Sequence, residues 1–230
     1  MTAEDYLSGK VLLIDKPLEW TSFQAVNKIR WHIKRKFGLK KIKVGHAGTL
    51  DPLATGLLII CVGKETKNIS TYQGQIKEYI GTFTLGATTP SYDLETEVNQ
   101  TFPIDHITDE LLSETTQNFT GEIDQKPPIF SAIKKDGKRL YELARKGQTT
   151  EIASRKVTIS EFDITKIELP KVDFRVVCSK GTYIRSLAND YGEALNSGAH
   201  LSVLRRTKIG DYSVNNAKTI EQFIHDLEME

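Results

Sequence analysis

The 230-residue sequence predicts a mixed α+β protein, with a mainly antiparallel central sheet flanked by helices. Segments with strand and helix patterns interleave irregularly, which does not fit the regular alternation of βαβ repeats. Hydrophobic residues form 39% of the chain, and 31 lysines and arginines nearly balance 30 aspartates and glutamates. This composition is typical of a folded protein with a sizeable core rather than a disordered chain.

The first predicted elements are a buried strand over residues 10–15 and an amphipathic helix. Thr21, with Gln24 three residues later, is typical of a capping box at a helix start. Gly38 predicts the end of this helix. Its apolar stripe recurs at helical spacing and consists of Phe23, Val26, Ile29, Ile33 and Phe37.

Further strands and helices follow along the chain. The apolar run 57–62 predicts a core strand, and alternation predicts another strand over residues 79–85. Residues 157–169 and 172–178 are predicted to form a hairpin. Three more helices are expected, and the threonines that would cap them are Thr108, Thr182 and Thr219.

No targeting segment, membrane segment or metal site is predicted. The longest apolar run, residues 57–62, is far shorter than the roughly 20 residues of a membrane-spanning helix. The polar, acidic opening does not resemble a secretory signal. Cys61 and Cys178 are too few for a disulfide framework, and no His/Cys pairs stand at zinc-ligand spacing. We therefore expect a cytoplasmic protein.

Charge is strongly segregated along the chain. Eight lysines and arginines and no acid lie within residues 28–46, whereas nine acids and no lysine or arginine lie within residues 91–124. A second basic cluster covers residues 134–146. Because a polyanion responds to local potential rather than to net charge, basic clusters on one face could hold a phosphate backbone. A solvated charged face is the alternative interpretation.

Two loops beside predicted strands carry candidate reactive groups. Asp51 is the lone carboxylate of residues 45–58, which lead into a buried strand, a common place for catalytic groups. Asp before Pro is also a common turn starter. Arg185 falls in the first turn of a predicted helix, where the helix dipole disfavours a cation. This position suggests a fixed carboxylate or phosphate partner, with an ordinary surface arginine as the alternative.

A third stretch, residues 125–147, interleaves basic side chains with Phe130 and Tyr141, as stacking on bases plus phosphate contacts would need. A helix with a solvated basic face is again the alternative. No nucleotide cofactor is predicted, because there is no Gly-x-Gly-x-x-Gly motif after a strand and Glu65 interrupts the phosphate-loop-like residues 63–66.

Together these stretches resemble the TruB-type tRNA pseudouridine synthases, which isomerise the uridine at position 55 of the tRNA T loop. The resemblance implies the pseudouridine synthase fold and an isomerase without metal or organic cofactor. Matching motifs follow the family's order from about residue 9 to about residue 217. They also include Lys16-Pro17-x-x-x-Thr21-Ser22, Lys77-Glu78-Tyr79, Leu85-Gly86-x-Thr88-Thr89 and Gly198-Ala199-His200-Leu201-x-x-Leu204-Arg205-Arg206.

The resemblance implies three catalytic residues. The single catalytic aspartate falls on Asp51, which would act covalently on the uridine and free the base from N1 so that it rejoins through C5. Attack on the ribose, attack on the base and a glycal route all remain open. Tyr79 matches the tyrosine that stacks on the target base and is a candidate for removing the C5 proton. Arg185 matches the arginine that pairs with the catalytic carboxylate.

Substrate contacts are implied in the same way. His46 matches the histidine that fills the gap left when the target nucleotide leaves the T-loop stack. Tyr183 and Leu204 match residues that line the uracil pocket. Asp93 matches an aspartate near the substrate, although its segment departs from the usual Asp- and Gly-rich turn. Four residues are candidate phosphate contacts by motif position and charge: Lys16, Lys134, Arg139 and Arg145.

Residues 1–217 are expected to form the catalytic domain, and residues 218–230 a short helix and an acidic tail. The PUA-type RNA-binding domain that follows in many bacterial relatives is not expected. The expected partner is tRNA, bound through its T-arm stem-loop by a monomer that needs no protein partner and no membrane.

Two alternatives remain. The guide-RNA-dependent, dyskerin-like relatives share these motifs but normally carry the PUA-type domain and basic extensions. An RNA-binding or tRNA-folding chaperone that has lost catalysis would belong to a different class, and the presence of Asp51, Tyr79 and Arg185 argues against it.

Overall fold

The computed structural model describes residues 1–131, 133–135, 137–148 and 150–229. Its backbone contacts divide the chain into two compact units. Unit 1 comprises Met1–Tyr79 with Leu204–Glu230, and unit 2 comprises Ile80–Val203. Two long strands, β4 (Lys77–Leu85) and β12 (Ala199–Ile209), contribute residues to both units.

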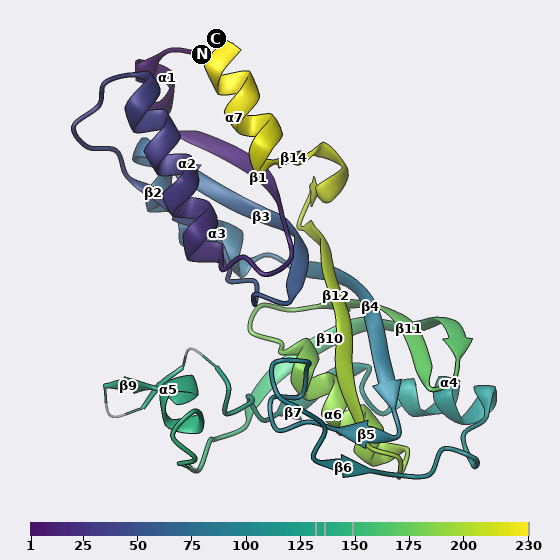
Figure 1. The fold of residues 1–230 in the computed structure, drawn as a ribbon. Helices are drawn as coiled ribbons and strands as arrows, with labels where there is room; N and C mark the ends of the chain where they lie inside the picture. Colours follow the sequence, from purple (N-terminus) through teal and green to yellow (C-terminus); the bar gives the residue numbers. More distant parts are fainter. Residues whose placement is uncertain (132, 136, 149, 230) are drawn as a thin grey trace. The chain divides into compact units, whose positions relative to one another are not determined.

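Ten strands form one large sheet in the order β14-β1-β3-β12-β4-β11-β10-β7, with β2 on β3 and β13 on β12 (Figure 1). Most described neighbours are antiparallel, and β1–β14 and β3–β12 are parallel. This confirms the predicted α+β class. The other strands of the sheet are β1 (Lys10–Lys16), β2 (Val44–His46), β3 (Ala54–Val62), β7 (Gly121–Gln125), β10 (Arg155–Glu168), β11 (Lys171–Cys178), β13 (Tyr212–Ser213) and β14 (Lys218–Thr219).

The remaining elements are two short two-stranded sheets and the helices. The short sheets pair β5 (Ala87–Thr88) with β6 (Gln100–Thr101), and β8 (Lys134–Lys135) with β9 (Lys138–Arg139). The helices are α1 (Ala3–Ser8), α2 (Ser22–Lys36), η1 (Gly63–Asn68), α3 (Ile69–Gly74), α4 (Asp109–Gln117), α5 (Leu140–Ala144), α6 (Ile184–Ala194), η2 (Val214–Asn216) and α7 (Ile220–Met229). Within the described part of the chain, none of them is long and apolar enough to cross a membrane.

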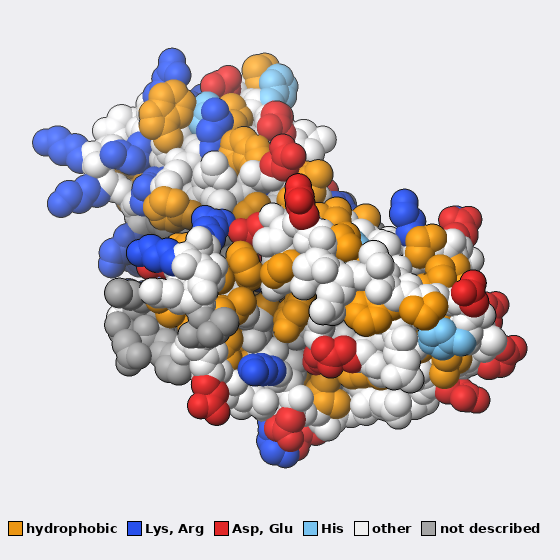
Figure 2. Space-filling model, turned by 60° about the horizontal axis from the view of Figure 1, so that its bottom comes forward, with side chains coloured by type: hydrophobic (Ala, Val, Ile, Leu, Met, Phe, Trp, Pro, Cys, Tyr) orange, Lys and Arg blue, Asp and Glu red, His pale blue; other side chains and the backbone are white. Residues whose placement is uncertain are grey.

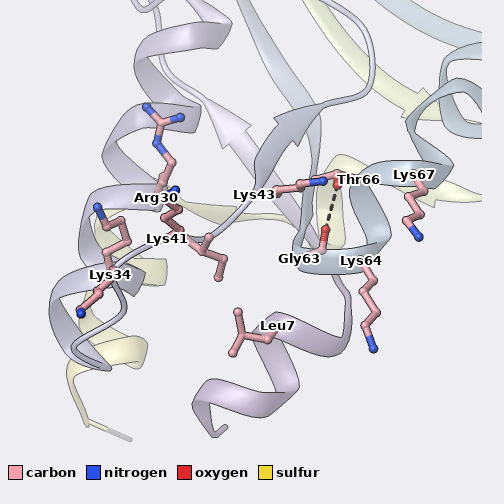
Figure 3. Close-up of a pocket in the computed structure, with 11 residues that line it drawn as sticks. Leu7, Arg30, Lys34, Lys41, Lys43, Gly63, Lys64, Thr66 and Lys67 are labelled. Carbon is pink, nitrogen blue, oxygen red and sulfur yellow. Dashed lines mark hydrogen bonds between the residues drawn. The ribbon is translucent and has the colours of Figure 1, made fainter.

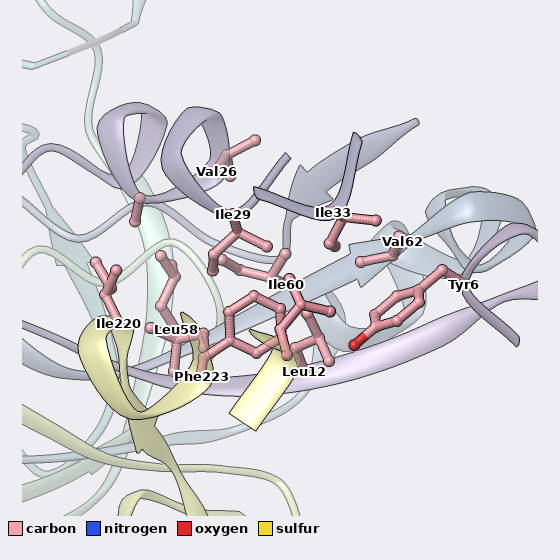
Figure 4. Packing of buried hydrophobic residues seen from close by; sticks show 13 residues of the cluster. Tyr6, Leu12, Val26, Ile29, Ile33, Leu58, Ile60, Val62, Ile220 and Phe223 are labelled. Atoms are coloured by element: carbon pink, nitrogen blue, oxygen red, sulfur yellow. The ribbon is translucent and has the colours of Figure 1, made fainter. Parts of the chain in front are cut away.

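The core of unit 1 packs α2 and α7 against one face of the sheet (Figure 4). Strand β3 is buried on both faces, because Leu58 and Ile60 belong to this core while Leu57 and Ile59 belong to a second cluster. Double burial explains why the predicted core strand shows a continuous apolar run without alternation. The inward residues of the two helices are Ala25, Val26, Ile29, Ile33, Ile220, Phe223 and Leu227.

Helix α2 confirms its predicted start and corrects one predicted core residue. The Thr21 hydroxyl accepts from the N–H of Gln24 at 3.1 Å, and the Gln24 side chain accepts from the N–H of Thr21 at 2.7 Å. The prediction that Phe23 is buried is wrong, since this side chain is 64% exposed. The buried stripe begins instead at Ser22, whose hydroxyl bonds the backbone of Leu50, so the next position along the helix turns outward.

Unit 2 is built around an aromatic cluster. Phe83 of β4 stacks on Phe174 of β11 with ring centroids 4.0 Å apart, and Phe162 of β10 meets Tyr191 of α6 at 5.3 Å. The Tyr191 hydroxyl donates to the carbonyl of Leu112 on α4 at 2.7 Å. The predicted hairpin is confirmed, because β10 and β11 pair antiparallel along their length.

The starts of two further helices test the N-caps that were predicted for them. Thr219 and Gln222 exchange two hydrogen bonds at the start of α7, as predicted. The predicted cap at Thr182 is wrong, because its hydroxyl donates to the carbonyl of Ser179. The N-cap of α6 is Tyr183, which makes no side-chain cap bond, so Tyr183 precedes the first helical turn.

Candidate active site

Asp51 lies in the loop that connects β2 and β3, residues 47–53 (the Asp51 loop). The Asp51 carbonyl accepts from the N–H of Ala54 at 3.0 Å, which closes a turn with Pro52 at its second position. The turn interpretation of Asp-Pro is therefore confirmed. It does not compete with a chemical role, because the turn uses only the backbone of Asp51, whose side chain is half-buried.

Ser22, the first residue of α2, and Glu19, which precedes the helix, both form hydrogen bonds with the backbone of the Asp51 loop. The N–H of Leu50 donates to the Ser22 hydroxyl at 2.9 Å, and that hydroxyl donates to the Leu50 carbonyl at 3.1 Å. The N–H of Glu19 donates to the Pro52 carbonyl at 2.8 Å. Ser22 is only 2% exposed, so these bonds are shielded from water. Asp51 is thus flanked on both sides by fixed backbone groups.

Arg206 holds the same loop from the sheet. Its buried guanidinium donates to the carbonyls of Leu57 at 2.8 Å, Gly48 at 3.1 Å and Thr49 at 3.5 Å. The parallel register sets Arg206 opposite Gly56, whose φ is +103°. A Cβ at Gly56 would lie 2.3 Å from the Arg206 carbonyl oxygen, so this close pairing of β3 and β12 requires glycine.

Lys16 is fully buried beneath the turn. Its ammonium donates to the carbonyls of Trp20 at 2.6 Å, Pro17 at 2.8 Å and Pro52 at 3.5 Å. Burial lowers the pKa of Lys16 to about 8, and the negative charge of Asp51 offsets part of that shift. A buried ammonium that points at three carbonyls is not offered to a phosphate on the surface, so this geometry favours a role in positioning the loop.

Three further predicted residues lie in unit 1. Burial and the positive charge of Arg206 lower the pKa of His46, which favours a neutral imidazole at neutral pH. Leu204 pairs with Ala54, three residues after Asp51, and is 9% exposed. Tyr79, also 9% exposed, lies on β4, the strand next to β12.

In unit 2, Arg185 and Asp93 form a buried pair. The Arg185 Nε lies 3.6 Å from Asp93 Oδ2, and the two side chains are only 5% and 8% exposed. Arg185 also donates to the Ser91 carbonyl at 3.4 Å, while the other Asp93 oxygen accepts from the N–H of Glu95 at 3.0 Å. The unfavourable helix position of Arg185 therefore has a carboxylate partner. The implied pairing of Arg185 with Asp51 stays a prediction.

Tyr183 is fixed by two residues that the sequence prediction missed. Gln125 donates to the Tyr183 carbonyl at 3.0 Å and accepts from its N–H at 2.8 Å. The Arg155 guanidinium lies over the Tyr183 ring, 4.7 Å from its centroid, and also donates to the Gly181 carbonyl. No local pattern marks these residues, since they reach Tyr183 only through the tertiary fold.

The predicted basic contacts of unit 2 surround an aromatic ring. Arg139 and Arg145 lie 5.8 and 5.4 Å from the centroid of Tyr141, and Arg145 also pairs with Glu95 at 2.7 Å. Lys134 pairs with Arg139 in the β8–β9 ladder, and its side chain lies outside the described part of the structure. This arrangement combines cations with a stacking surface, as single-stranded RNA binding requires.

The fold matches that of a class of solved structures. A Cbf5-Nop10-Gar1 complex aligns with a TM-score of 0.71 and 29% identity over 98% of this chain. The archaeal box H/ACA sRNP Nop10-Cbf5 complex aligns with a TM-score of 0.70 and 25% identity over 100% of this chain. The chain spans 56% and 57% of the length of those chains. The fold is that of the pseudouridine synthases.

Sequence comparisons define the family within this class. The TruB family pseudouridylate synthase N-terminal domain matches residues 34–184, and the tRNA pseudouridylate synthase B C-terminal domain matches residues 185–229. The protein called tRNA pseudouridine synthase B in Flavobacterium johnsoniae is 69% identical over 99% of this chain and its own full length. That of Phocaeicola vulgatus is 58% identical over 95% of this chain and 93% of its own length. The chain belongs to the TruB family of pseudouridylate synthases and is an isomerase.

Proposed function

We propose that this protein converts the uridine at position 55 of the tRNA T loop into pseudouridine, with Asp51 as the catalytic carboxylate. The observation that carries the proposal is the Asp51 loop, which Ser22, Arg206 and Lys16 hold from three sides in a member of a pseudouridylate synthase family. Preorganised groups of this kind need little rearrangement when the substrate binds. The close similarity to proteins called tRNA pseudouridine synthase B supports tRNA as the substrate.

The proposed reaction is balanced without any other reactant. The bond between N1 and C1′ breaks, a bond between C5 and C1′ forms, C5 loses a proton and N1 gains one. Asp51 acts as the covalent catalyst that releases the base. Hydrolysis of a glycosidic bond would instead require a carboxylate pair that activates water. Asp51 is the only acid among residues 47–53, and a single carboxylate is what the isomerisation requires.

The other residues serve the extruded nucleotide, because the reacting atoms C1′ and C5 are inaccessible in a folded loop. Tyr79 stacks on the target base and takes or relays the C5 proton, and Leu204 contributes to the same pocket. Neutral His46 fills the gap in the T loop. Tyr183 and Arg185, both in unit 2, are proposed to serve the same nucleotide. Asp93 is the residue that orients Arg185, which the pair at 3.6 Å supports.

Arg139, Arg145 and Lys134 are proposed to contact tRNA phosphates, with Tyr141 as a stacking surface between the two arginines. Lys16 is not retained as a phosphate contact, because its ammonium is buried among carbonyls. We propose that the enzyme works on tRNA alone, in the cytoplasm and as a monomer. The Cbf5 chains of the similar structures are found in complexes with other proteins.

Incubation of the purified protein with an unmodified tRNA transcript tests this proposal. Pseudouridine is mapped by carbodiimide-dependent stops of reverse transcription, with a transcript that carries cytidine at position 55 as the matched control. We expect one strong stop at position 55 and none on the control. No modification without added proteins or guide RNA, or modification at another position, would contradict the proposal.

A further inference from the structure

Unit 1 contains a second candidate binding site that shares no residue with the Asp51 loop. It is a cavity of about 650 Å³ (the basic pocket), lined by seven lysines and arginines and by no acid. In the space-filling view, Lys and Arg side chains gather at the upper left, over this part of unit 1 (Figure 2). Neither the family comparison nor the candidate active site assigns a role to this pocket.

Three chain segments contribute the cations of the basic pocket (Figure 3). Arg30 and Lys34 lie one turn apart on α2, so they share a face of that helix. The loop that follows α2 contributes three lysines, and η1 contributes two on the opposite side of the pocket. These five residues are Lys40, Lys41, Lys43, Lys64 and Lys67.

Two hydrogen bonds fix Gly63, which lines the pocket. The N–H of Gly63 donates to the Lys43 carbonyl at 2.8 Å, and the Thr66 hydroxyl donates to the Gly63 carbonyl at 2.8 Å. Gly63 has φ of +62°, and a Cβ there would lie 2.1 Å from the carbonyl oxygen of Tyr6. Helix α1 therefore packs directly on Gly63, and its Leu7 forms part of the wall (Figure 3).

The charges of the pocket are not neutralised within the protein. Among the described residues, none of the seven cations forms an ion pair, whereas Lys156 and Lys166 each pair with a glutamate. Glu65, the acid of η1, does not line the pocket, and its carboxylate accepts from the Tyr72 hydroxyl at 2.6 Å. The helix dipole accounts only for the cations in the last turn of α2, including Lys34. Such a cluster repels itself and favours a polyanion.

We propose that the basic pocket binds the phosphodiester backbone of the RNA substrate, at nucleotides outside the loop that carries the target uridine. This inference rests on the proposed function. Helix α2 begins at Ser22, beside the Asp51 loop, and its rise of about 1.5 Å per residue places Arg30 and Lys34 roughly 12 and 18 Å further along its axis. A nucleotide held at Asp51 does not reach that far.

A base-paired RNA stem attached to the target loop is long enough to extend from Asp51 to the basic pocket, and its phosphates carry negative charge. A double-stranded RNA stem carries closely spaced phosphate charges on both strands, so a stem that passes α2 offers several phosphates to the pocket. A free nucleotide or pyrophosphate shares the same phosphate chemistry and is the competing ligand. The RNA backbone is favoured over a free phosphate compound, because the seven cations come from separate segments along an open cavity. A row of consecutive phosphates can contact such a spread of cations.

The test compares two triple variants that remove the same number of positive charges. The pocket variant is Lys41→Gln, Lys64→Gln and Lys67→Gln, whose parent side chains are exposed, so the fold should be retained. The control variant is Lys156→Gln, Lys166→Gln and Lys171→Gln on the exposed parts of β10 and β11. Kd for a tRNA transcript is measured at several salt concentrations, together with kcat and KM for pseudouridine formation.

For the pocket variant we expect affinity at low salt to fall at least about tenfold and the salt dependence of log Kd to become shallower by about 2 to 3. KM should rise and kcat should be unchanged, because the pocket contributes equally to ground-state and transition-state binding. The control variant should behave like the parent. Unchanged affinity and salt dependence in the pocket variant would overturn the proposal, even if the parent protein forms pseudouridine at position 55.

A second experiment distinguishes the RNA backbone from a free phosphate compound as the ligand of the basic pocket. Thermal unfolding of the parent and the pocket variant is followed with and without inorganic pyrophosphate or ATP. Stabilisation of the parent alone, combined with unchanged tRNA affinity of the pocket variant, would assign the pocket to a free phosphate compound and overturn the RNA assignment. If the pocket variant loses RNA affinity while the parent makes no pseudouridine at position 55, the pocket stands and the proposed function fails.

Discussion

At the scale of single residues, the Asp51 loop depends on buried polar groups whose roles are structural. The charged side chains of Lys16 and Arg206 both donate hydrogen bonds to backbone carbonyls around Asp51. A buried cation without such partners would cost several kcal/mol, so each of these contacts is needed to keep the cation in place. These contacts hold the backbone of the loop, and their contribution can be tested apart from catalysis.

The titration of Lys16 offers one test of this burial. The unfolded chain keeps the Lys16 proton up to its ordinary pKa of 10.5, whereas the folded protein releases it at about 8. Stability from this group therefore rises with pH between about 8 and 10.5, by at most about 1.4 kcal/mol per pH unit. Free energies of unfolding of the parent and of Lys16→Met, measured from pH 7 to 10, should diverge in favour of the parent above pH 8. A difference that does not change with pH would exclude a depressed pKa.

Tyr79 gives a test of chemistry at the residue scale. Tyr79→Phe keeps the ring that would stack on the base and removes the hydroxyl. We expect tRNA affinity to be retained and turnover to fall by orders of magnitude, because the hydroxyl is proposed to take or relay the C5 proton. Single-turnover rates and Kd values on the same transcript measure both effects. A near-normal rate would reduce Tyr79 to a stacking platform.

Sequence motifs pointed to some residues of the candidate site and not to others. Asp51 stands out as a lone carboxylate before a core strand, and the odd helix position of Arg185 correctly indicated a fixed partner. Gln125 and Arg155 contact Tyr183 across about 30 to 60 residues of chain, which no local spacing encodes. Lys16 was a candidate phosphate contact by motif position and charge, and neither feature shows that its side chain is buried.

At the scale of elements, the periodicity of apolar residues predicted most helices and strands, but it did not predict correctly every residue that faces the core. The run 57–62 was predicted correctly as a strand because a doubly buried strand shows continuous apolar residues. Phe23 was assigned to the core because it fits the helical spacing, yet the hydrogen bonds of Ser22 set the rotation of α2. Tertiary contacts at a helix start therefore override an apolar pattern.

The pairing of β3 with β12 leads to a prediction at this scale. Gly56→Ala places a Cβ 2.3 Å from the Arg206 carbonyl oxygen at a residue with φ of +103°. The strands would have to separate, and the Arg206 contacts to the Asp51 loop would be lost with them. We expect a destabilisation of about 2 to 4 kcal/mol, measured by urea unfolding. Gly74→Ala is the matched control, since a Cβ there meets nothing within 4 Å, and equal stability of the two variants would contradict this account.

At the scale of the whole molecule, basic groups and the residues proposed for chemistry occur in both units. Unit 1 holds Asp51 and the basic pocket, and unit 2 holds Arg185 and the cluster around Tyr141. RNA is generally recognised at loops through splayed and stacked bases, with phosphate contacts adding affinity. Substrate recognition should therefore depend mainly on the T arm.

This expectation can be measured with two substrates. A T-arm stem-loop of about 17 nucleotides should be modified with a kcat/KM within about a hundredfold of that for whole tRNA, equivalent to roughly 2.7 kcal/mol of transition-state binding. Affinity for both should fall as salt rises, because each neutralised phosphate releases counterions. A larger loss on the stem-loop would show that contacts outside the T arm dominate recognition.

The most direct test of the central claim is the rate of pseudouridine formation by Asp51→Asn under single-turnover conditions, with tRNA binding measured on the same preparation. Asparagine keeps the size and shape of the side chain, and the turn closed by the Asp51 backbone is unaffected. We predict no detectable pseudouridine at position 55 and a Kd for tRNA close to that of the parent, because only the nucleophilic carboxylate is lost. Appreciable activity of Asp51→Asn would contradict the account.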